Sequence, residues 1–567
     1  MSRSAYDQGV PSFHSVDVSQ YHSYDLTPFP SDSDTLATET PSQRRLARAL
    51  IASKRLQDDG LAAVRSNELS RDDREALVDA GFLKPVIKGW YMPSSPNESD
   101  GDTTAWYACA DDFMVRYCET RFGAAWCVGA DHSVRLHAGN TALPAQVVVN
   151  ALAGGNSVVQ LPAGHSILDY RAKDFPPPRH RTTVRGWRAM TLELALIRVP
   201  ESFYRTNARD AQIALLGLKD GSVLVRQLLA GSHSVVAGRL VGALRACGQD
   251  AIADDVLHTM QSVGHAVSET NPFAAPPPSF AMLRGESPYV SRIRLMWASM
   301  RSDVIAAFPP APGLPTAPAA YLAAVKDLYA RDAYHSLSIE GYRVTRELIE
   351  RVASGGWRPE LNDADEQSRD AMAARGYHLA RVEVEASVGG ILGGSNAGLV
   401  ASRDHRTWYR ELFAPSVTAG LLKAGDLAGY RGHQVYIRQA AHVPPPFEAV
   451  RDMMPALFDL MASEPQACVR AVLGHFVFVF IHPYADGNGR MGRFLMNVMM
   501  ASGGYPWTVI ELARRSDYMA ALDDASAREN IAPFARLVAS CMRSETARIK
   551  KRPVAVKVSA GRRRRKA

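Results

Sequence analysis

The sequence contains few cysteines and no long hydrophobic segment. Six cysteines are scattered over 567 residues without a C-x-x-C pair or another metal-like spacing, so we expect buried thiols and no structural zinc. The most apolar run, residues 472–481, is only ten residues long, about half the length that crosses a membrane. Residues 1–40 lack the apolar core of a secretory signal. We therefore expect a cytoplasmic protein without a membrane span.

Strong charge is also missing from most of the chain. The net charge is +7, yet residues 550–567 alone hold nine Lys or Arg and no Asp or Glu. Removing that tail leaves a body at about −2, which does not favour a broadly basic nucleic-acid-binding surface. Runs of like charge are typically solvated. We expect 550–567 to be a disordered appendage, with either an acidic or nucleic-acid contact or no specific partner.

Twelve consecutive residues, His482–Arg493, combine residue types that suit phosphate chemistry. Gly487 and Gly489 allow the backbone to turn tightly, so that its N–H groups converge on an anion. A helix that begins near Arg490 would direct its unsatisfied N–H groups and its positive dipole end at the same place. This part of the sequence therefore predicts a phosphate site.

The charged residues of the same string extend that prediction to a nucleotide and a reaction. Asp486 is an oxygen ligand that suits Mg²⁺ bridging phosphate oxygens. Arg490 and Arg493 are three residues apart, on one helical face, and suit forked contacts to further phosphates. His482 has an ordinary pKa near 6.5, so it can accept a proton from an incoming hydroxyl at neutral pH. Together they indicate nucleotidyl transfer.

This string resembles the Fic (filamentation induced by cAMP) motif, HPFx[D/E]GNGRxxR, with Tyr484 in place of the usual Phe. Family members of this form typically move AMP from ATP to a Ser, Thr or Tyr hydroxyl of a target protein. The resemblance implies that His482 activates the hydroxyl and that Asp486 holds Mg²⁺. The nucleotide contacts that it implies are Gly487, Asn488 and Gly489 at the α- and β-phosphates, Arg490 at the β-phosphate and Arg493 at the γ-phosphate, with Met491 and Gly492 between them.

A second motif lies upstream, where Ser336 and Glu340 fit the family's inhibitory pattern [S/T]xxxE[G/N]. Apolar residues at i, i+3, i+4 and i+7 spacing predict that residues 319–349 are largely helical. An Arg–carboxylate fork between Glu340 and Arg493 would occupy the group expected at the γ-phosphate. Similar proteins with this arrangement are autoinhibited, and in some the same Glu supports removal of AMP from the target.

A third match resembles the family's flap, which runs from Gly429 to Pro446. Residues Val435–Arg438 alternate as a short strand would, so we expect a β-hairpin. In relatives the flap pairs by its backbone with an extended piece of the target protein, which is strand addition. The flap residues placed near the nucleotide and target on this basis are Gln439, Ala440, Ala441 and His442.

Tyr518 stands where relatives place an aromatic ring against the adenine. It is our candidate for base stacking, although a tyrosine that faces the core fits the sequence as well. Ser526 falls roughly where the family often has an Asn that reads the base. ATP is the expected substrate on the family resemblance. Because a Ser replaces the base-reading Asn, transfer of UMP or phosphocholine is the alternative within the family.

The N-terminal half contains a pattern of its own. Ser70 can cap a helix from Arg71 to Ala80, Gly81 can end it, and residues 82–91 can form a short β-ribbon. With the following segments, this arrangement weakly resembles AbiEi-type winged-helix antitoxin and regulator modules. The resemblance implies DNA binding, with four candidate phosphate contacts: Arg71, Arg74, Lys84 and Lys88. Four acidic residues in the expected helix oppose it, so a protein-docking role is an equal alternative.

The expected fold class is mainly α, with a helical Fic core, a β-hairpin flap, and winged-helix-like and mixed α/β regions before it. On family grounds we expect 472–481 to be a helix, although its β-branched content favours a strand. The expected regions are a disordered tail (1–40), a winged-helix-like domain (41–95), a mixed α/β domain (96–270), a Pro-rich linker (271–318), the Fic domain (319–549) and the basic tail (550–567). An autoinhibited protein adenylyltransferase is the expected function, and a DNA-binding regulator of the toxin–antitoxin type is the alternative.

Overall fold

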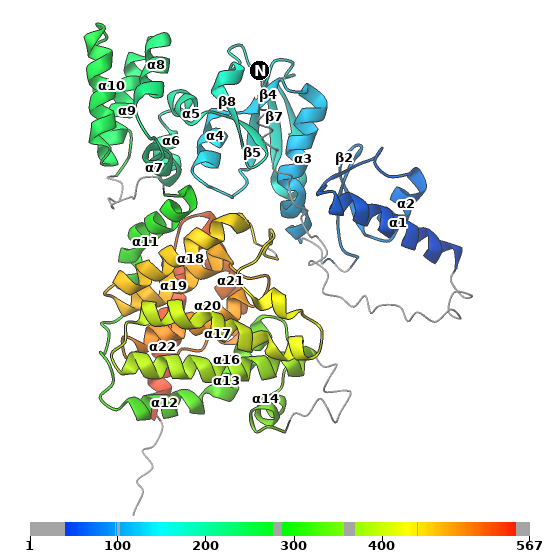
Figure 1. Ribbon diagram of the computed structural model, residues 1–567, viewed down its shortest axis with the longest axis vertical. Coiled ribbons are helices and arrows are strands. Elements are labelled where there is room, and N and C mark those ends of the chain that lie inside the picture. Colours follow the sequence, from blue (N-terminus) through cyan, green and yellow to red (C-terminus); the bar gives the residue numbers. More distant parts are fainter. Residues whose placement is uncertain are drawn as a thin grey trace, which may run out of the picture. The chain divides into compact units, whose positions relative to one another are not determined.

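The computed structural model describes residues 40–96, 98, 102–275, 286–356, 369–438 and 440–551. The chain forms two compact units (Figure 1). The first comprises Met1–Ser299, Tyr430–Met454 and Phe480–Ala485, and the second comprises Met300–Gly429, Pro455–Val479 and Asp486–Ala567. Disorder is expected for the two tails, residues 1–40 and 550–567. Of these, residues 1–39 and 552–567 lie outside the described residues.

The first unit begins with the elements that the sequence predicts for the winged-helix-like region. Helix α1 (Pro41–Asp58) is followed by β1 (Val64–Arg65), α2 (Arg71–Asp79), β2 (Leu83–Ile87) and β3 (Trp90–Pro93), and the strands pair antiparallel in the order β1-β3-β2. The Ser70 side chain accepts a hydrogen bond from the Asp73 N–H and caps α2. Gly81, at φ +78°, follows the helix in a left-handed conformation.

A small α/β region follows. Its elements are α3 (Thr104–Phe122), β4 (Trp126–Val128), α4 (Ala130–His137), β5 (Gln146–Ala151), β6 (Ser157–Gln160), β7 (Ser166–Arg171), β8 (Arg181–Val184) and β9 (Trp187–Met190), with 3₁₀ turns at Pro162–Gly164 and Pro178–His180. The four-stranded sheet has the order β4-β5-β7-β6, in which only β5 and β7 are parallel, and β8 pairs with β9. Its core contains Trp106, Phe113 and Trp126.

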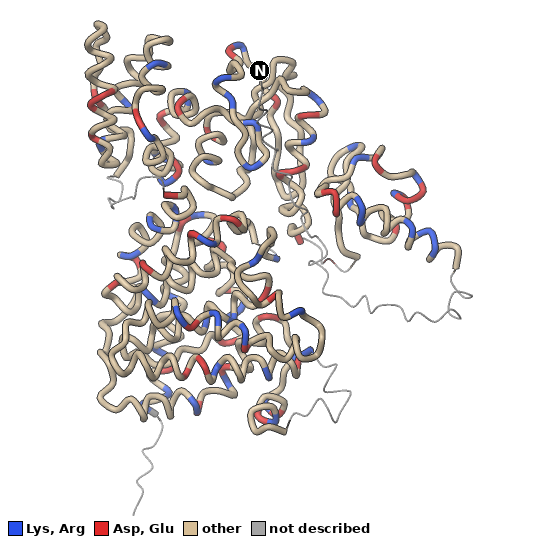
Figure 2. Tube along the Cα trace, viewed as in Figure 1, with Lys and Arg blue, Asp and Glu red and all other residues tan. Residues whose placement is uncertain are grey.

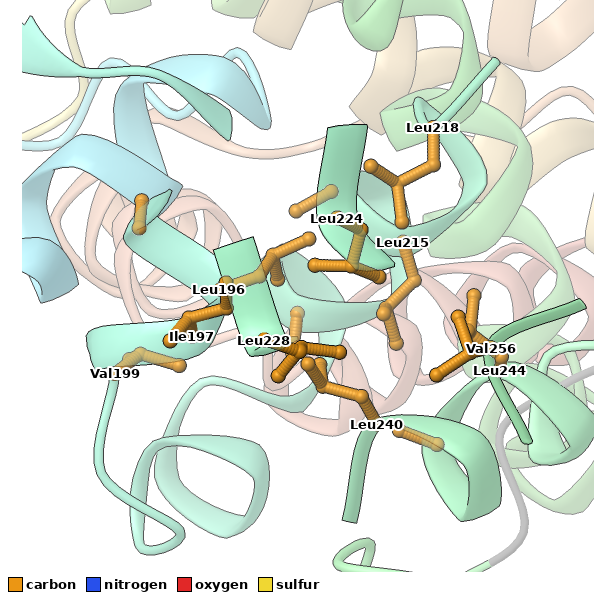
Figure 3. Close-up of a cluster of buried hydrophobic side chains, with 14 of the residues drawn as sticks. Leu196, Ile197, Val199, Leu215, Leu218, Leu224, Leu228, Leu240, Leu244 and Val256 are labelled. Atoms are coloured by element: carbon orange, nitrogen blue, oxygen red, sulfur yellow. The ribbon is translucent and has the colours of Figure 1, made fainter. Parts of the chain in front are cut away.

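Helices alone continue the first unit after Met190. They are α5 (Leu192–Arg198), α6 (Phe203–Thr206), α7 (Ala208–Leu216), α8 (Ser222–Ala230), α9 (Ser234–Ala246) and α10 (Asp250–Ser262). Leucine, isoleucine and valine side chains from these helices form a second core, part of which is drawn in Figure 3. The strands expected across 96–270 therefore end at Met190, and the rest of that region is helical.

The region expected to be a Pro-rich linker, 271–318, contains a long helix. Helix α11 (Pro288–Ala307) lies between the two proline clusters. Pro288 occupies its first position, where the missing N–H costs nothing, and residues such as Met296 and Val304 are buried. The prediction erred because it read the whole interval from the prolines at its two ends.

The described residues of the second unit form helices and connecting loops and no strand. Its helices are α12 (Pro318–Asp327), α13 (Tyr329–Ile339), α14 (Arg346–Ala353), α16 (Arg369–Leu392), α17 (Ala397–Thr418), α20 (Asn488–Ala501), α21 (Arg515–Ala527) and α22 (Ala532–Lys551), with short 3₁₀ turns at Ala424–Leu427 and Leu512–Arg514. Helices α18 (Phe447–Ser463) and α19 (Ala467–Ile481) contribute residues to both units. The mainly α fold class is confirmed, and 472–481 is helical.

Glycines allow the central helices of the second unit to approach closely. A Cβ atom on Gly376 of α16 would lie 2.0 Å from the Leu412 carbonyl oxygen of α17. A Cβ atom on Gly398 of α17 would lie 2.3 Å from the Ala462 nitrogen. Any larger residue at either position would push the helices apart, so these glycines fix the spacing of the helices that surround α20.

The stretch 319–349, which the sequence predicts to be largely helical, consists of α12, α13 and the first part of α14. Helix α13 ends at Ile339, Glu340 is its C-cap, and Gly341 turns the chain at φ +87°. Within the core, Arg381 of α16 donates to the Asp332 carboxylate of α13 at 2.5 Å. The Tyr377 hydroxyl donates to the same carboxylate at 2.8 Å. This buried pair anchors α13 to α16 and therefore fixes the helix end that carries Glu340.

The predicted strand Val435–Arg438 is wrong, because the described residues of 430–446 form no strand. Side chains take the carbonyl groups that a hairpin would pair. Arg431 donates to His433 O and Pro445 O, and Gln434 Nε2 donates to Pro444 O. Pro444, Pro445 and Pro446 also lack the N–H donors of a ladder. The segment is thus an irregular loop.

Helices that are long and apolar enough to cross a membrane are absent from the described part of the chain.

Candidate active site

The motif His482–Arg493 passes from the first unit into the second between Ala485 and Asp486. In the second unit, Gly487 is the N-cap of α20 at φ +80°. A Cβ atom there would lie 2.8 Å from the Phe413 ring. Only glycine fits this turn, and it opens a helix whose first N–H groups have no carbonyl partner one turn earlier. The helix begins at Asn488, close to the start predicted near Arg490, and anion binding at this end stays a prediction.

Arg490 is held flat at the beginning of α20. It is 1% exposed, and its guanidinium lies between two aromatic rings, 5.1 Å from the centroid of Tyr342 and 5.0 Å from that of Phe413. Its Nη2 donates to the Asp486 carboxylate at 3.2 Å. Burial by itself lowers the pKa of Arg490, but Tyr342 and Asp486 outweigh it, so the pKa is raised overall. Arg490 is a permanent, oriented cation.

Arg493 is joined to both residues of the inhibitory motif. Its Nη2 donates to Glu340 Oε1 at 2.7 Å and to the Ser336 carbonyl oxygen at 2.9 Å, while its Nε donates to Ser336 Oγ at 2.8 Å. Burial opposes the charge of Arg493, yet the adjacent Glu340 raises its pKa above the ordinary value. The pairing predicted from the two sequence motifs is present within the second unit.

The Glu340 carboxylate also lies directly against the glycine turn. A Cβ atom on Gly489 would stand 2.2 Å from Glu340 Oε1. Among the buried polar atoms without a hydrogen-bond partner in the described structure are Nε of Arg490 and Nη1 of Arg493. Unpaired buried donors of this kind cost free energy unless an acceptor arrives. The beginning of α20 thus presents guanidinium donors that lack an acceptor, and the Glu340 carboxylate lies beside them.

The other half of the motif belongs to the first unit. His482 has φ +53°, in the left-handed region that residues other than glycine seldom adopt. Arg431 Nε donates to the His482 carbonyl oxygen at 2.8 Å, and the Arg431 N–H donates to Pro483 O at 2.9 Å. Tyr484 is 1% exposed and lies 5.7 Å from the Tyr430 ring. The Tyr in place of Phe is therefore an apolar anchor of the loop.

The flap residues named from sequence are only partly described. Gln439 lies outside the described residues, and Ala440 and Ala441 are partly exposed. His442 is buried, stacks on Phe480 at 4.3 Å, and pairs through Nε2 with the Phe480 carbonyl oxygen. Burial lowers the pKa of His442 to about 4. His442 is therefore a neutral packing residue in this conformation.

Tyr518 lies in the core of the second unit. It is 2% exposed, its hydroxyl pairs with His475 Nε2 at 2.9 Å, and its ring is 6.1 Å from that of Phe534. This arrangement corresponds to the core-facing alternative rather than to an exposed stacking platform. Ser526 donates to Leu522 O within its own helix.

Several residues that shape the site were not singled out from sequence. Tyr342 and Phe413 enclose Arg490, and Arg431 binds the backbone of His482. Tyr342 stands two residues after Glu340, so an aromatic residue next to the inhibitory motif was one available signal. For Arg431, the signal was an arginine placed between Tyr430 and Gly432 in a loop with few other charges.

The Fic/DOC family profile matches residues 402–500, which include most of α17, all of α18 and α19, the whole of the His482–Arg493 string and most of α20. This segment of the chain is similar to the Fic domain. The matched segment holds the glycine turn and both arginines described above, whereas Ser336 and Glu340 lie upstream of it. Sequence and geometry thus agree on the position of this domain.

Curated relatives of this chain are named "Protein adenylyltransferase Fic". One from Nematostella vectensis is 28% identical over 222 residues, which is 38% of this chain and 48% of the relative. Another from Drosophila willistoni is 29% identical over 222 residues, or 38% of this chain and 41% of the relative. The chain therefore spans less than half the length of these relatives.

Solved Fic structures are also similar to the chain, at low identity. A Fic-domain-containing signalling protein from Bacteroides thetaiotaomicron is 17% identical, with a TM-score of 0.33, and the alignment covers 46% of this chain and 96% of that one. Fic-1 from C. elegans is 18% identical, with a TM-score of 0.34, and the alignment covers 58% of this chain and 91% of that one. At these scores nothing further follows for the Fic domain.

Proposed function

We propose that this protein is an autoinhibited protein adenylyltransferase, which transfers AMP from ATP to a Ser, Thr or Tyr hydroxyl of a target protein. The observation that carries the proposal is the beginning of α20, where Arg490 and Arg493 are buried and keep unpaired guanidinium nitrogens. Such donors suit phosphate oxygens. The printed name of the curated relatives supports the same activity.

In the proposed reaction, His482 acts as the general base. Its imidazole accepts the proton of the target hydroxyl as that oxygen attacks the α-phosphorus. A new P–O bond forms to the target, the bond between the α-phosphorus and the bridging oxygen breaks, and pyrophosphate leaves. Arg490 and Arg493 bind the β- and γ-phosphates and stabilise the negative charge that the leaving group gains.

Asp486 is the proposed ligand of Mg²⁺. Its side chain is 64% exposed, and it adjoins the anion-binding end of α20. The described residues contain no cluster of three His, Cys, Asp or Glu that would hold a metal ion alone. One carboxylate fits a Mg²⁺ ion whose remaining ligands are phosphate oxygens and water. When bound, Mg²⁺ supplies charge neutralisation of the triphosphate.

Glu340 provides the proposed regulation. Because its carboxylate already binds Arg493 Nη2, the γ-phosphate must displace it to reach the same group. ATP that binds without that displacement takes a pose in which the α-phosphate is not aligned for attack. Glu340 can also orient water for removal of AMP from the target, which is the reverse activity known among similar proteins.

The target protein is proposed to bind through the flap, residues 429–446, by main-chain pairing with an extended segment. The irregular loop seen over 430–446 would then become a strand when its partner arrives.

The DNA-binding alternative receives little support from the charged residues of α2 and β2. Acidic and basic residues are interspersed along α2, whereas α1 has five basic residues and one acidic residue, Asp58 (Figure 2). Arg71 pairs with Glu75, Arg74 donates to Ser66 O, and Lys84 pairs with Glu98. Three of the four candidate phosphate contacts thus already have a partner within the chain. We favour protein docking for this region.

The proposed function is tested by incubating the Glu340→Gly variant with α-³²P-ATP and a cell lysate. We expect labelled protein bands, and mass spectrometry of a band should show an added AMP on a hydroxyl residue. Addition of UMP or phosphocholine in parallel incubations would favour the alternative group. Equal labelling by the Glu340→Gly/His482→Ala variant would contradict the proposal.

A further inference from the structure

Arg431 binds more backbone carbonyl groups than any ordinary surface arginine would. Its Nε donates to His482 O at 2.8 Å, its Nη1 to His433 O at 3.0 Å, and its Nη2 to Pro445 O at 2.5 Å and, more weakly, to Ile481 O at 3.5 Å. The residue is 6% exposed. One guanidinium therefore connects the flap backbone to the backbone around His482.

No carboxylate forms an ion pair with Arg431 among the described residues. Burial lowers its pKa to about 10, and Glu448 and Tyr436 offset this effect only in part. It therefore stays protonated at neutral pH, and its hydrogen bonds all go to backbone carbonyl groups. A buried cation without a counterion is costly, so a simple packing role would be met at lower cost by an apolar residue.

The backbone of His482 explains what this cation stabilises. A left-handed conformation is strained for a residue with a Cβ atom, and it persists only where the surroundings fix it. Arg431 contacts the carbonyl groups of Ile481, His482 and Pro483, through its side chain and its own N–H. These bonds fix the peptide planes on both sides of His482, and so the direction of its imidazole.

We propose that Arg431 is a positioning residue for His482, which holds the general base in its left-handed conformation and connects that conformation to the flap. The inference rests on the proposed transferase activity of the same motif. Because this role acts on His482 and not on the nucleotide, the loss of Arg431 should slow the chemical step while ATP binding is retained. It should also make the His482 segment more mobile.

The first test measures kcat and KM for ATP in the Glu340→Gly background. We expect Arg431→Ala to lower kcat by about 100-fold with KM changed by less than about threefold, because misorientation of a base affects the transition state and not nucleotide binding. Arg431→Lys keeps the charge but lacks the planar fork, and should recover less than a tenth of the lost rate. Added guanidinium ion should partly restore Arg431→Ala.

The matched control is Arg239→Ala. Arg239 is also partly buried, stacks on Tyr204 and donates to a main-chain carbonyl, that of Val199, but lies outside the motif. Its loss should leave kcat unchanged. A kcat for Arg431→Ala equal to that of its parent, or a fall matched by Arg239→Ala, would overturn the inference.

A second measurement does not depend on activity. Hydrogen exchange of a peptide covering residues 480–486 should become at least about tenfold faster in Arg431→Ala and remain unchanged in Arg239→Ala. If Glu340→Gly itself transfers no label, the proposed function fails, and exchange decides the positioning role alone. Unchanged exchange over 480–486 in a folded Arg431→Ala protein would overturn it.

Discussion

The two halves of the Fic motif hold their functional residues by different kinds of interaction. Arg493 is bound by the Glu340 side chain, a carboxylate that another anion can replace. His482 is bound through its backbone by Arg431, and no substrate supplies an equivalent bond. Under the proposed function, phosphate displaces Glu340 from Arg493 in one half of the motif, whereas the backbone contacts of His482 in the other half stay in place. Substitutions in the first half should therefore switch the enzyme, and those in the second should disable it.

The largest expected effect comes from the base itself. In the Glu340→Gly background, His482→Ala should lower the rate of AMP transfer by about 10²–10⁴-fold, the usual contribution of a general base. The initial rate of labelling from α-³²P-ATP measures it. Calorimetric ATP affinity should change by less than about threefold, because His482 contacts the hydroxyl and not the phosphates. A retained rate would show that the base half is not catalytic.

The next largest expected effect is an increase in the transfer rate, and it comes from the contact between Glu340 and Arg493. Glu340→Gly should raise the transfer rate by about 10- to 100-fold, which corresponds to about 1.5–3 kcal/mol for one charge-assisted hydrogen bond. The same labelling assay applies. Glu350→Gly, which removes an exposed carboxylate from α14, is the matched control and should leave the rate unchanged. Equal rates in wild type and Glu340→Gly would remove the basis for autoinhibition.

A smaller activation is expected from Ser336→Ala. It removes the hydrogen bond from Arg493 Nε to Ser336 Oγ but leaves the Ser336 carbonyl and Glu340 in place. A neutral partner contributes about 1 kcal/mol, so the rate should rise by no more than about fivefold. If the rate falls instead, Ser336 orients Arg493 for the nucleotide rather than holding it in the inhibited state.

The two compact units should respond alike to acid, because each contains a buried neutral histidine. Burial lowers the pKa of His475 to about 3 and that of His442 to about 4, from 6.5. Below pH 6.5 the unfolded chain binds protons that the folded chain does not, so stability is complete above that pH and falls as the pH drops. Each site contributes a slope of up to about 1.4 kcal/mol per pH unit.

Thermal unfolding at pH 7.5, 6.0 and 5.0 measures this slope. The Tm of wild type should fall over that range, and His475→Gln should fall less steeply, because its side chain binds no proton in either state. His132 and His405 are buried as well and contribute to the wild-type slope, so the comparison between the two proteins is the informative quantity. Parallel curves for both proteins would argue against a neutral buried His475.

The parts of the site that sequence predicted are those with a strict local pattern. The spacing of Asp486, Gly487 and Arg490 determines the helix start, and Glu340 reached Arg493 as the inhibitory pattern implies. Each of these follows from a short motif, because glycine conformation and helical periodicity act over a few residues.

The parts that sequence missed depend on contacts between distant segments. Alternating residues at Val435–Arg438 suggested a strand, but Arg431 and Gln434 take the carbonyl groups of that loop. Helix α11 was not predicted, because it lies between two proline clusters that indicate a linker. It gains its stability from buried residues such as Val304. Tertiary packing decided both outcomes, and no local propensity reports it.

A double-mutant cycle on Glu340 and Arg493 tests the central claim most directly. The rates of AMP transfer are measured for wild type, Glu340→Gly, Arg493→Ala and the double variant. Because Glu340 is proposed to inhibit by occupying Arg493, its removal should raise the rate at least about tenfold in the wild-type background and not at all once Arg493 is alanine. An equal activation by Glu340→Gly in both backgrounds would contradict the account.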